Sequence, residues 1–199
     1  MKTISVSGSS RTEVGKRATN ALRKEGLVPC CLYGEKKDEN GNPVATAFSV
    51  PVEGLRKLIY SPDIFVVELT IDEKPIKAVM REIQFHPVKD NVLHVDFYEI
   101  TDEKPIVMAV PVKLEGLAQG VRAGGKLVQL QRRLKVKALY TNIPEKLVID
   151  VTALELGKSI KVGEVSFENL ELVTPKEALV CAVKTTRASQ AAAAAAAKK

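Results

Sequence analysis

Apolar and polar residues alternate along several stretches of the chain, most clearly in "VLHVDFY". Successive side chains of a β-strand point to opposite faces. Leu93, Val95 and Phe97 would therefore form an apolar face packed on a core. The other face would carry the remaining side chains of the stretch, which are Val92, His94, Asp96 and Tyr98. The pattern predicts a strand that offers a histidine and a carboxylate to a partner or a cleft.

Similar alternation predicts further strands in the first half of the chain. Polar turns rich in glycine and proline separate them, and Asp72–Lys74 reads as the tight turn of a hairpin. A second hairpin around "PVKDN" would bring Gln84 and His86 onto one surface with His94 and Asp96. The expected strands lie at residues 3–7, 30–34, 47–50, 64–71, 75–85 and 91–100.

A helical period replaces the alternation in two places. In "RTEVGKRATNALRKEG" the apolar residues recur at helical spacing, which predicts a helix that ends near Gly26. Its apolar face would hold Val14, Ala18, Ala21 and Leu22, whereas Arg17, Asn20, Arg23 and Lys24 would point away from it. A second, shorter helix is expected between Pro51 and Pro62.

From Thr101 onward the pattern is again one of strands, joined by a glycine-rich connection, "GVRAGG", which we interpret as a tight turn. The fold class is therefore mainly β (α+β), with an N-terminal antiparallel β-barrel that carries two short helices and a β-rich second domain. The expected boundaries are 1–98 for the barrel, 99–187 for the second domain and 188–199 for a low-complexity alanine tail.

Composition narrows the class of protein. The chain has 199 residues, 45% of them hydrophobic and 27% charged, and it contains neither a signal-peptide pattern nor an apolar run of membrane-spanning length. Cys30 and Cys31 are adjacent in a predicted strand and Cys181 is distant, so all three read as small core residues rather than as a disulfide or metal clamp. These features favour a cytoplasmic protein.

The net charge is +6 and is unevenly distributed. Residues 1–33 contain six Lys or Arg and two Asp or Glu, a net charge of +4, whereas residues 34–97 contain eight and eleven, a net charge of −3. The positive charge is thus concentrated around the first helix, where it favours a polyanionic partner such as RNA.

His86, His94 and Asp96 raise the alternative of a metal-dependent hydrolase. The usual accompanying markers of a metal or nucleophilic site, such as H-E-x-x-H or G-x-S-x-G, are absent from the sequence. We therefore expect no enzyme activity, metal or other cofactor, and no small-molecule substrate. A protein-interaction module whose basic character is incidental is the other alternative.

The order and spacing of four motifs carry a family resemblance. R-x-x-x-G-K-x-x-x-x-x-L-R spans residues 11–23, P-x-x-x-Y-G spans 29–34, Q-x-H-P spans 84–87 and H-V-D-F spans 94–97. Together they resemble the bacterial ribosomal protein family that binds 5S rRNA, the twenty-fifth of the large-subunit series. The second half resembles the family's long two-domain form, known as the CTC or general stress protein form.

The resemblance implies a ribosomal protein that binds the loop E region of 5S rRNA in the central protuberance of the large subunit. The chain departs from the family pattern at Asn20 and Ala21, where arginines are common, and at Arg17, where a small residue is common. The RNA-facing residues that the resemblance and the charge pattern suggest are Arg11, Lys16, Arg17, Arg23, Tyr33, Gln84, His86, His94 and Asp96.

Overall fold

The computed structural model describes residues 1–37 and 43–187. Residues 38–42, in the polar stretch between the strands predicted at 30–34 and 47–50, and the alanine tail lie outside the described residues. The chain forms two compact units, Met1–Lys104 and a second that begins at Pro105. The predicted fold class is confirmed, because strands dominate both units and the first contains a closed barrel.

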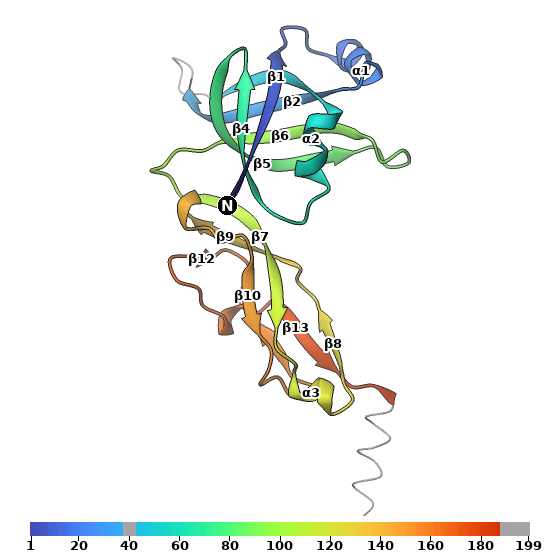
Figure 1. Ribbon diagram of the computed structural model, residues 1–199, viewed down its shortest axis with the longest axis vertical. Helices are drawn as coiled ribbons and strands as arrows, with labels where there is room; N and C mark the ends of the chain where they lie inside the picture. The colour runs from blue at the N-terminus through green and yellow to red at the C-terminus, as the bar shows by residue number, and fades with distance from the viewer. Residues whose placement is uncertain (38–42, 188–199) are drawn as a thin grey trace, which may run out of the picture. The chain divides into compact units, whose positions relative to one another are not determined.

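The barrel of the first unit has the strand order β1-β3-β2-β6-β5-β4 (Figure 1). Its strands are β1 (Lys2–Ser10), β2 (Leu27–Lys37), β3 (Pro43–Pro51), β4 (Phe65–Ile71), β5 (Lys74–Phe85) and β6 (Val92–Glu99). The pairing is antiparallel except between β1 and β4 and between β2 and β6, which are parallel. These two parallel pairs join strands that are distant in sequence. Together with the antiparallel pairs they close the sheet into a barrel.

The apolar faces of the strands meet inside this barrel. Phe48 and Phe97 are fully buried there, with ring centroids 5.8 Å apart. Helix α2 (Val52–Ile59) adds Leu55 and Leu58 to the same core. Burial of side chains this large contributes strongly to stability, and truncating a core Phe to Ala typically costs about 3–5 kcal/mol.

Helix α1 (Lys16–Lys24) is shorter than predicted and lies in a different orientation about its axis. None of its residues is buried, and Val14, expected on the apolar face, precedes the helix and is 73% exposed. Ala18 and Leu22 are half-buried, but Ala21 is exposed. The helix ends as expected before Gly26, whose φ of 79° suits glycine.

The turn between β4 and β5 is the predicted tight hairpin. Ile71 pairs with Lys74, so that Asp72 and Glu73 alone form the loop, with φ values of 46° and 68°. Two consecutive positive φ angles define a type I′ turn, which matches the twist of the flanking strands. The Asp72 carboxylate also accepts a hydrogen bond from the main-chain N–H of Ser10 at 3.2 Å.

The second unit contains two smaller sheets, with the strand orders β10-β7-β9-β12 and β11-β13-β8. Its strands are β7 (Ile106–Glu115), β8 (Lys126–Gln129), β9 (Arg133–Ala138), β10 (Leu147–Asp150), β11 (Ser159–Lys161), β12 (Glu171–Leu172) and β13 (Leu179–Lys184). Short helical turns connect them: α3 (Gln119–Arg122), η1 (Tyr140–Asn142) and η2 (Val162–Glu164).

The glycine-rich segment of this unit is not the plain turn that its sequence predicts, because it contains the single helical turn α3. A Cβ atom on Gly120 would lie 2.6 Å from the carbonyl carbon of Glu155 and 2.6 Å from the main-chain nitrogen of Leu156. Gly120 therefore allows two backbone segments to pack closely, and any larger residue there would clash with the main chain.

We expect Glu73→Gly to stabilise the barrel by roughly 0.5–1 kcal/mol, because it removes a side chain from the left-handed region at a modest entropic cost. Asp72→Gly should stabilise less or destabilise, since it also removes the acceptor for Ser10. Urea unfolding followed by tyrosine fluorescence would report on the barrel, which holds Tyr33, Tyr60 and Tyr98 of the four tyrosines. Equal effects of the two substitutions would contradict this account.

Candidate nucleic-acid interface

The hairpin of β5 and β6 has a register that gathers polar side chains on the outside of the barrel. Gln84 pairs with His94, and Glu82 pairs with Asp96. His94 and Asp96 are half-buried and flank the fully buried Val95. The prediction that Gln84, His94 and Asp96 share a face is therefore confirmed by the register.

The strict alternation predicted for β6 fails at Leu93. The register shifts between Gln84 and Phe85, which pairs with Val92, so one residue of β6 is left over as a bulge. Val92 is buried and Leu93 is only half-buried, the reverse of the prediction. Both residues are apolar, so the sequence alone contains no signal for the shift.

The carbonyl oxygen of Leu93 accepts two hydrogen bonds from the guanidinium of Arg23, from Nε at 3.1 Å and from Nη2 at 2.9 Å. Nη1 of the same guanidinium donates to Oδ1 of Asn20 at 3.2 Å. Arg23 was expected to point away from the barrel, and that expectation is wrong. Its side chain attaches helix α1 to the bulge of β6, although a guanidinium has five N–H donors and two of them stay available.

His94 and Asp96 form a close pair, with 3.0 Å between Nδ1 of the imidazole and Oδ1 of the carboxylate. Each side chain is about one quarter exposed, 25% for His94 and 24% for Asp96. A carboxylate at this distance favours the tautomer in which Nδ1 carries the proton, and it fixes the plane of the ring. Nε2 of His94 and the second oxygen of Asp96 are then left to contact a partner.

Strand β2 contributes the neighbouring part of this face through its parallel pairing with β6. Cys31 lies beside Asp96, and Tyr33 lies beside Tyr98. The two tyrosine rings make an edge-to-face contact, with centroids 5.9 Å apart. Burial raises the pKa of Tyr33 most, and the negative charge of Asp96 raises it further. The hydroxyl of Tyr33 therefore stays protonated and can act as a donor.

Arg11 follows β1, and its charge and that of Asp96 both act on Cys31. Burial has the largest effect on the pKa of Cys31 and raises it. The charge of Asp96 raises this pKa further, and the charge of Arg11 lowers it by less, so the net shift is upward. Burial likewise raises the pKa of Cys30 to about 12. Nε and Nη1 of Arg11 are buried and have no acceptor among the described residues. Buried donors without acceptors are costly, so this position would gain from a partner that supplies oxygen atoms.

His86 does not lie on the strand face where the sequence predicts it, because β5 ends at Phe85. Its Nδ1 accepts hydrogen bonds from the main-chain N–H groups of Val88 and Lys89, both at 3.2 Å. The imidazole thus stabilises the turn between β5 and β6. An accepting Nδ1 implies a proton on Nε2, which leaves one donor for a partner.

Lys16 and Arg17 are both exposed in the first turn of α1.

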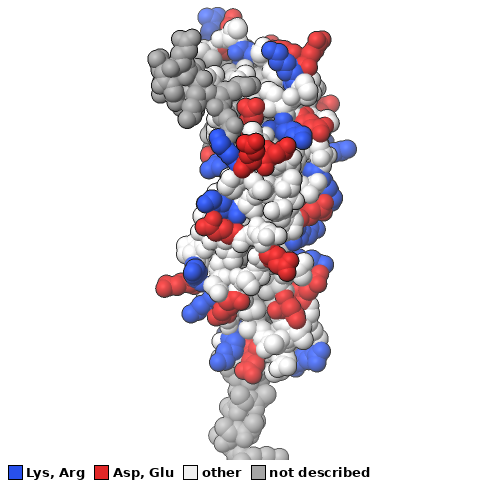
Figure 2. Space-filling model, turned by 90° about the vertical axis from the view of Figure 1, so that its left-hand side faces the viewer, with Lys and Arg blue, Asp and Glu red and all other residues white. Residues whose placement is uncertain are grey.

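The sequence analysis did not identify Arg81 and Glu82, whose charges affect the pKa of Tyr33 at the edge of this face. Their position follows from the pairing of Glu82 with Asp96, which cannot be read from the sequence without the register. On the side of the molecule seen in Figure 2, basic and acidic side chains are interspersed.

Within residues 1–37 and 43–187 no three His, Cys, Asp or Glu side chains come together in a way that could hold a metal ion. In the same part of the chain no helix is both long enough and apolar enough to span a bilayer.

Comparison with known proteins identifies the class. Residues 6–97 match the model of the ribosomal L25p family, and residues 105–187 match that of the C-terminal domain of ribosomal protein TL5. The chain is 65% identical to the large ribosomal subunit protein bL25 of Phocaeicola vulgatus and 57% identical to that of Bacteroides thetaiotaomicron, over 100% of each chain. The bL25 protein of Porphyromonas gingivalis is 54% identical over 97% of this chain and 98% of its own length.

These relatives define a structural protein of the ribosome, not an enzyme, which removes the hydrolase alternative. The chain belongs to the ribosomal L25p family, as the motifs in its sequence indicated.

We expect Arg23→Met to destabilise the barrel by about 1–2 kcal/mol, because the carbonyl of Leu93 loses both of its charged donors. Arg17→Met removes the same charge from an exposed site of the same helix and should stay within about 0.5 kcal/mol of the parent. Urea unfolding of the two variants would test this. If Arg17→Met proved as destabilising as Arg23→Met, the attachment would have no special role.

Proposed function

We propose that this large-subunit ribosomal protein binds 5S rRNA at its loop E region, in the central protuberance, through the outer face of β2, β5 and β6 together with helix α1. The barrel, residues 1–98, would carry this activity, and residues 99–187 would form a separate β-rich domain. As a component of the ribosome it works in the cytoplasm.

The observation that carries the proposal is the His94–Asp96 pair, held at 3.0 Å on the outer face of the barrel. A carboxylate on a surface that meets RNA repels phosphates, so its presence there favours contact with base edges instead. It accepts hydrogen bonds from the exocyclic amines of bases and from guanine imino groups. Tyr33, a neutral hydroxyl donor, and Gln84 add donors and acceptors on the same face.

Helix α1 supports the proposal from the other side. Lys16 and Arg17 are exposed and are well suited to neutralise phosphates, while Arg23 keeps the helix attached to β6. Regular A-form RNA hides the base edges of its deep major groove, so a protein that reads bases needs an irregular helix. The loop E region, which departs from regular helix geometry, meets that requirement.

Asp96→Ala should weaken binding to 5S rRNA by about 1–3 kcal/mol and reduce discrimination between the natural RNA and a loop E mutant. Glu168→Ala, an exposed carboxylate of the second unit, removes the same charge and serves as the control. Gel-shift titrations with both RNAs would measure the difference. If the parent protein bound both RNAs equally, base reading would be ruled out.

Lys16→Ala should instead lower affinity for both RNAs and reduce the slope of log affinity against log salt by about one unit, because one fewer counterion is released. Lys158→Ala, an exposed lysine of the second unit, should leave the slope unchanged. The same titrations at several salt concentrations give the slopes. An unchanged slope for Lys16→Ala would show that this lysine does not contact the RNA backbone.

A further inference from the structure

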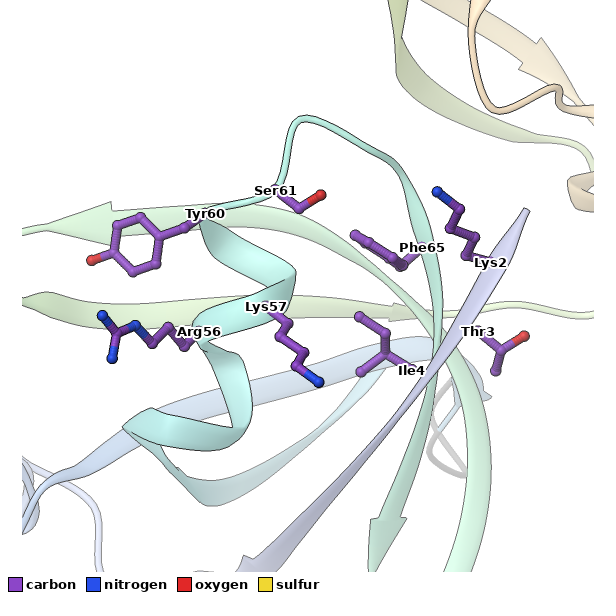
Figure 3. A pocket seen from close by; sticks show the side chains of 8 residues that line it. All are labelled: Lys2, Thr3, Ile4, Arg56, Lys57, Tyr60, Ser61 and Phe65. Atoms are coloured by element: carbon purple, nitrogen blue, oxygen red, sulfur yellow. The ribbon is translucent and has the colours of Figure 1, made fainter.

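The first unit contains a pocket that the proposed RNA-binding face does not use. It lies between helix α2 and strands β1 and β4, and its volume is about 790 Å³ (Figure 3). No residue of β2, β5 or β6 contributes to it. Its lining consists of Lys2, Thr3, Ile4, Arg56, Lys57, Tyr60, Ser61 and Phe65.

The floor of this pocket is apolar. Ile4 and Phe65 come from the parallel strands β1 and β4, and both are half-buried against the barrel core. They remain partly open because the chain leaves α2 at Tyr60, whose side chain is turned outward and is 67% exposed. The ring of Phe65 and the side chain of Ile4 thus stay partly open to solvent, and Tyr60 projects away from them, as Figure 3 shows.

The rim of the pocket carries positive charge only. Arg56 and Lys57 are exposed in the last turn of α2, and among the described residues neither forms an ion pair. Lys2 stands on the β1 side and is held by Asp63 at 2.8 Å. The lining contains no carboxylate, in contrast to the face around Asp96 and Glu82. An occupant should therefore combine a flat apolar group with a negative charge.

We propose that this pocket binds an unstacked nucleotide of RNA, with the base against Phe65 and Ile4 and the phosphate near Lys57. Unpaired bases commonly stack on aromatic side chains and arginine planes, while lysines neutralise the adjoining phosphates. Lys57 projects toward Ile4, whereas Arg56 and Tyr60 project from the other side of α2 and lie at the margin of the site. The site would give the barrel a second RNA contact, independent of the His94–Asp96 pair.

The chain has no tryptophan, so Phe65→Trp in the full-length protein would introduce a single fluorescent reporter in the floor of the pocket while keeping an aromatic ring in place. Titration with AMP at low ionic strength should quench this fluorescence, and adenosine, which lacks the phosphate, should bind more weakly. In the same background Lys57→Glu should weaken AMP binding by about threefold or more. Lys74→Glu, at the exposed β4–β5 turn, makes the same charge change and should have little effect.

The two sites can be distinguished, because Asp96→Ala should leave the AMP titration unchanged. Absence of quenching by AMP would overturn the proposal, as would equal losses from Lys57→Glu and Lys74→Glu, which would indicate only general charge attraction. Quenching by an acidic, leucine-containing tripeptide but not by AMP would also overturn it and would assign the pocket to a protein partner.

Discussion

The parallel pairing of β2 with β6 is the constraint on which the candidate site depends. Without it the sheet would stay open, and Tyr33 would not lie beside Tyr98, nor Cys31 beside Asp96. The same pairing places Cys30 beside Val95 on the inner side, where both are fully buried. Core packing and the polar face are therefore two sides of one strand pair. Since parallel strands need a long connection, the chain between β2 and β6 includes three further strands of the barrel and helix α2.

The acidic residues on this face have a physical role that the basic ones cannot take. Lysine and arginine side chains attract any phosphate, so alone they give affinity without selectivity. Asp96 lies opposite Glu82 and is held by His94, and this concentration of negative charge is unfavourable beside an RNA backbone. Any RNA that approaches must offer donors there. In the proposed complex the acidic positions would select among RNAs, and the basic positions on α1 and at Arg11 would supply attraction.

Local patterns predicted much of this arrangement. The alternation around Val95 and the tight turn predicted at Asp72–Lys74 follow from short-range sequence rules, whereas the shared face of Gln84 and His94 also depends on the register of the β5–β6 hairpin. Features that depend on long-range pairing were missed, including the two parallel strand pairs and the position of Glu82. The apolar spacing in α1 also misled, because its small alanines give a weak burial preference that the hydrogen bonds of Arg23 outweigh.

The hydrogen bonds from Arg23 to the bulge at Leu93 have a geometric consequence. They hold the basic start of α1 at a set distance from His94, the residue next to the bulge. In the proposed RNA complex, the distance between the helix that would contact phosphates and the strand that would read bases is then already set in the free protein. The fixed distance between these two elements would make binding depend on the width of the RNA groove. An RNA that is too narrow or too wide would satisfy one element and miss the other, even with the right bases.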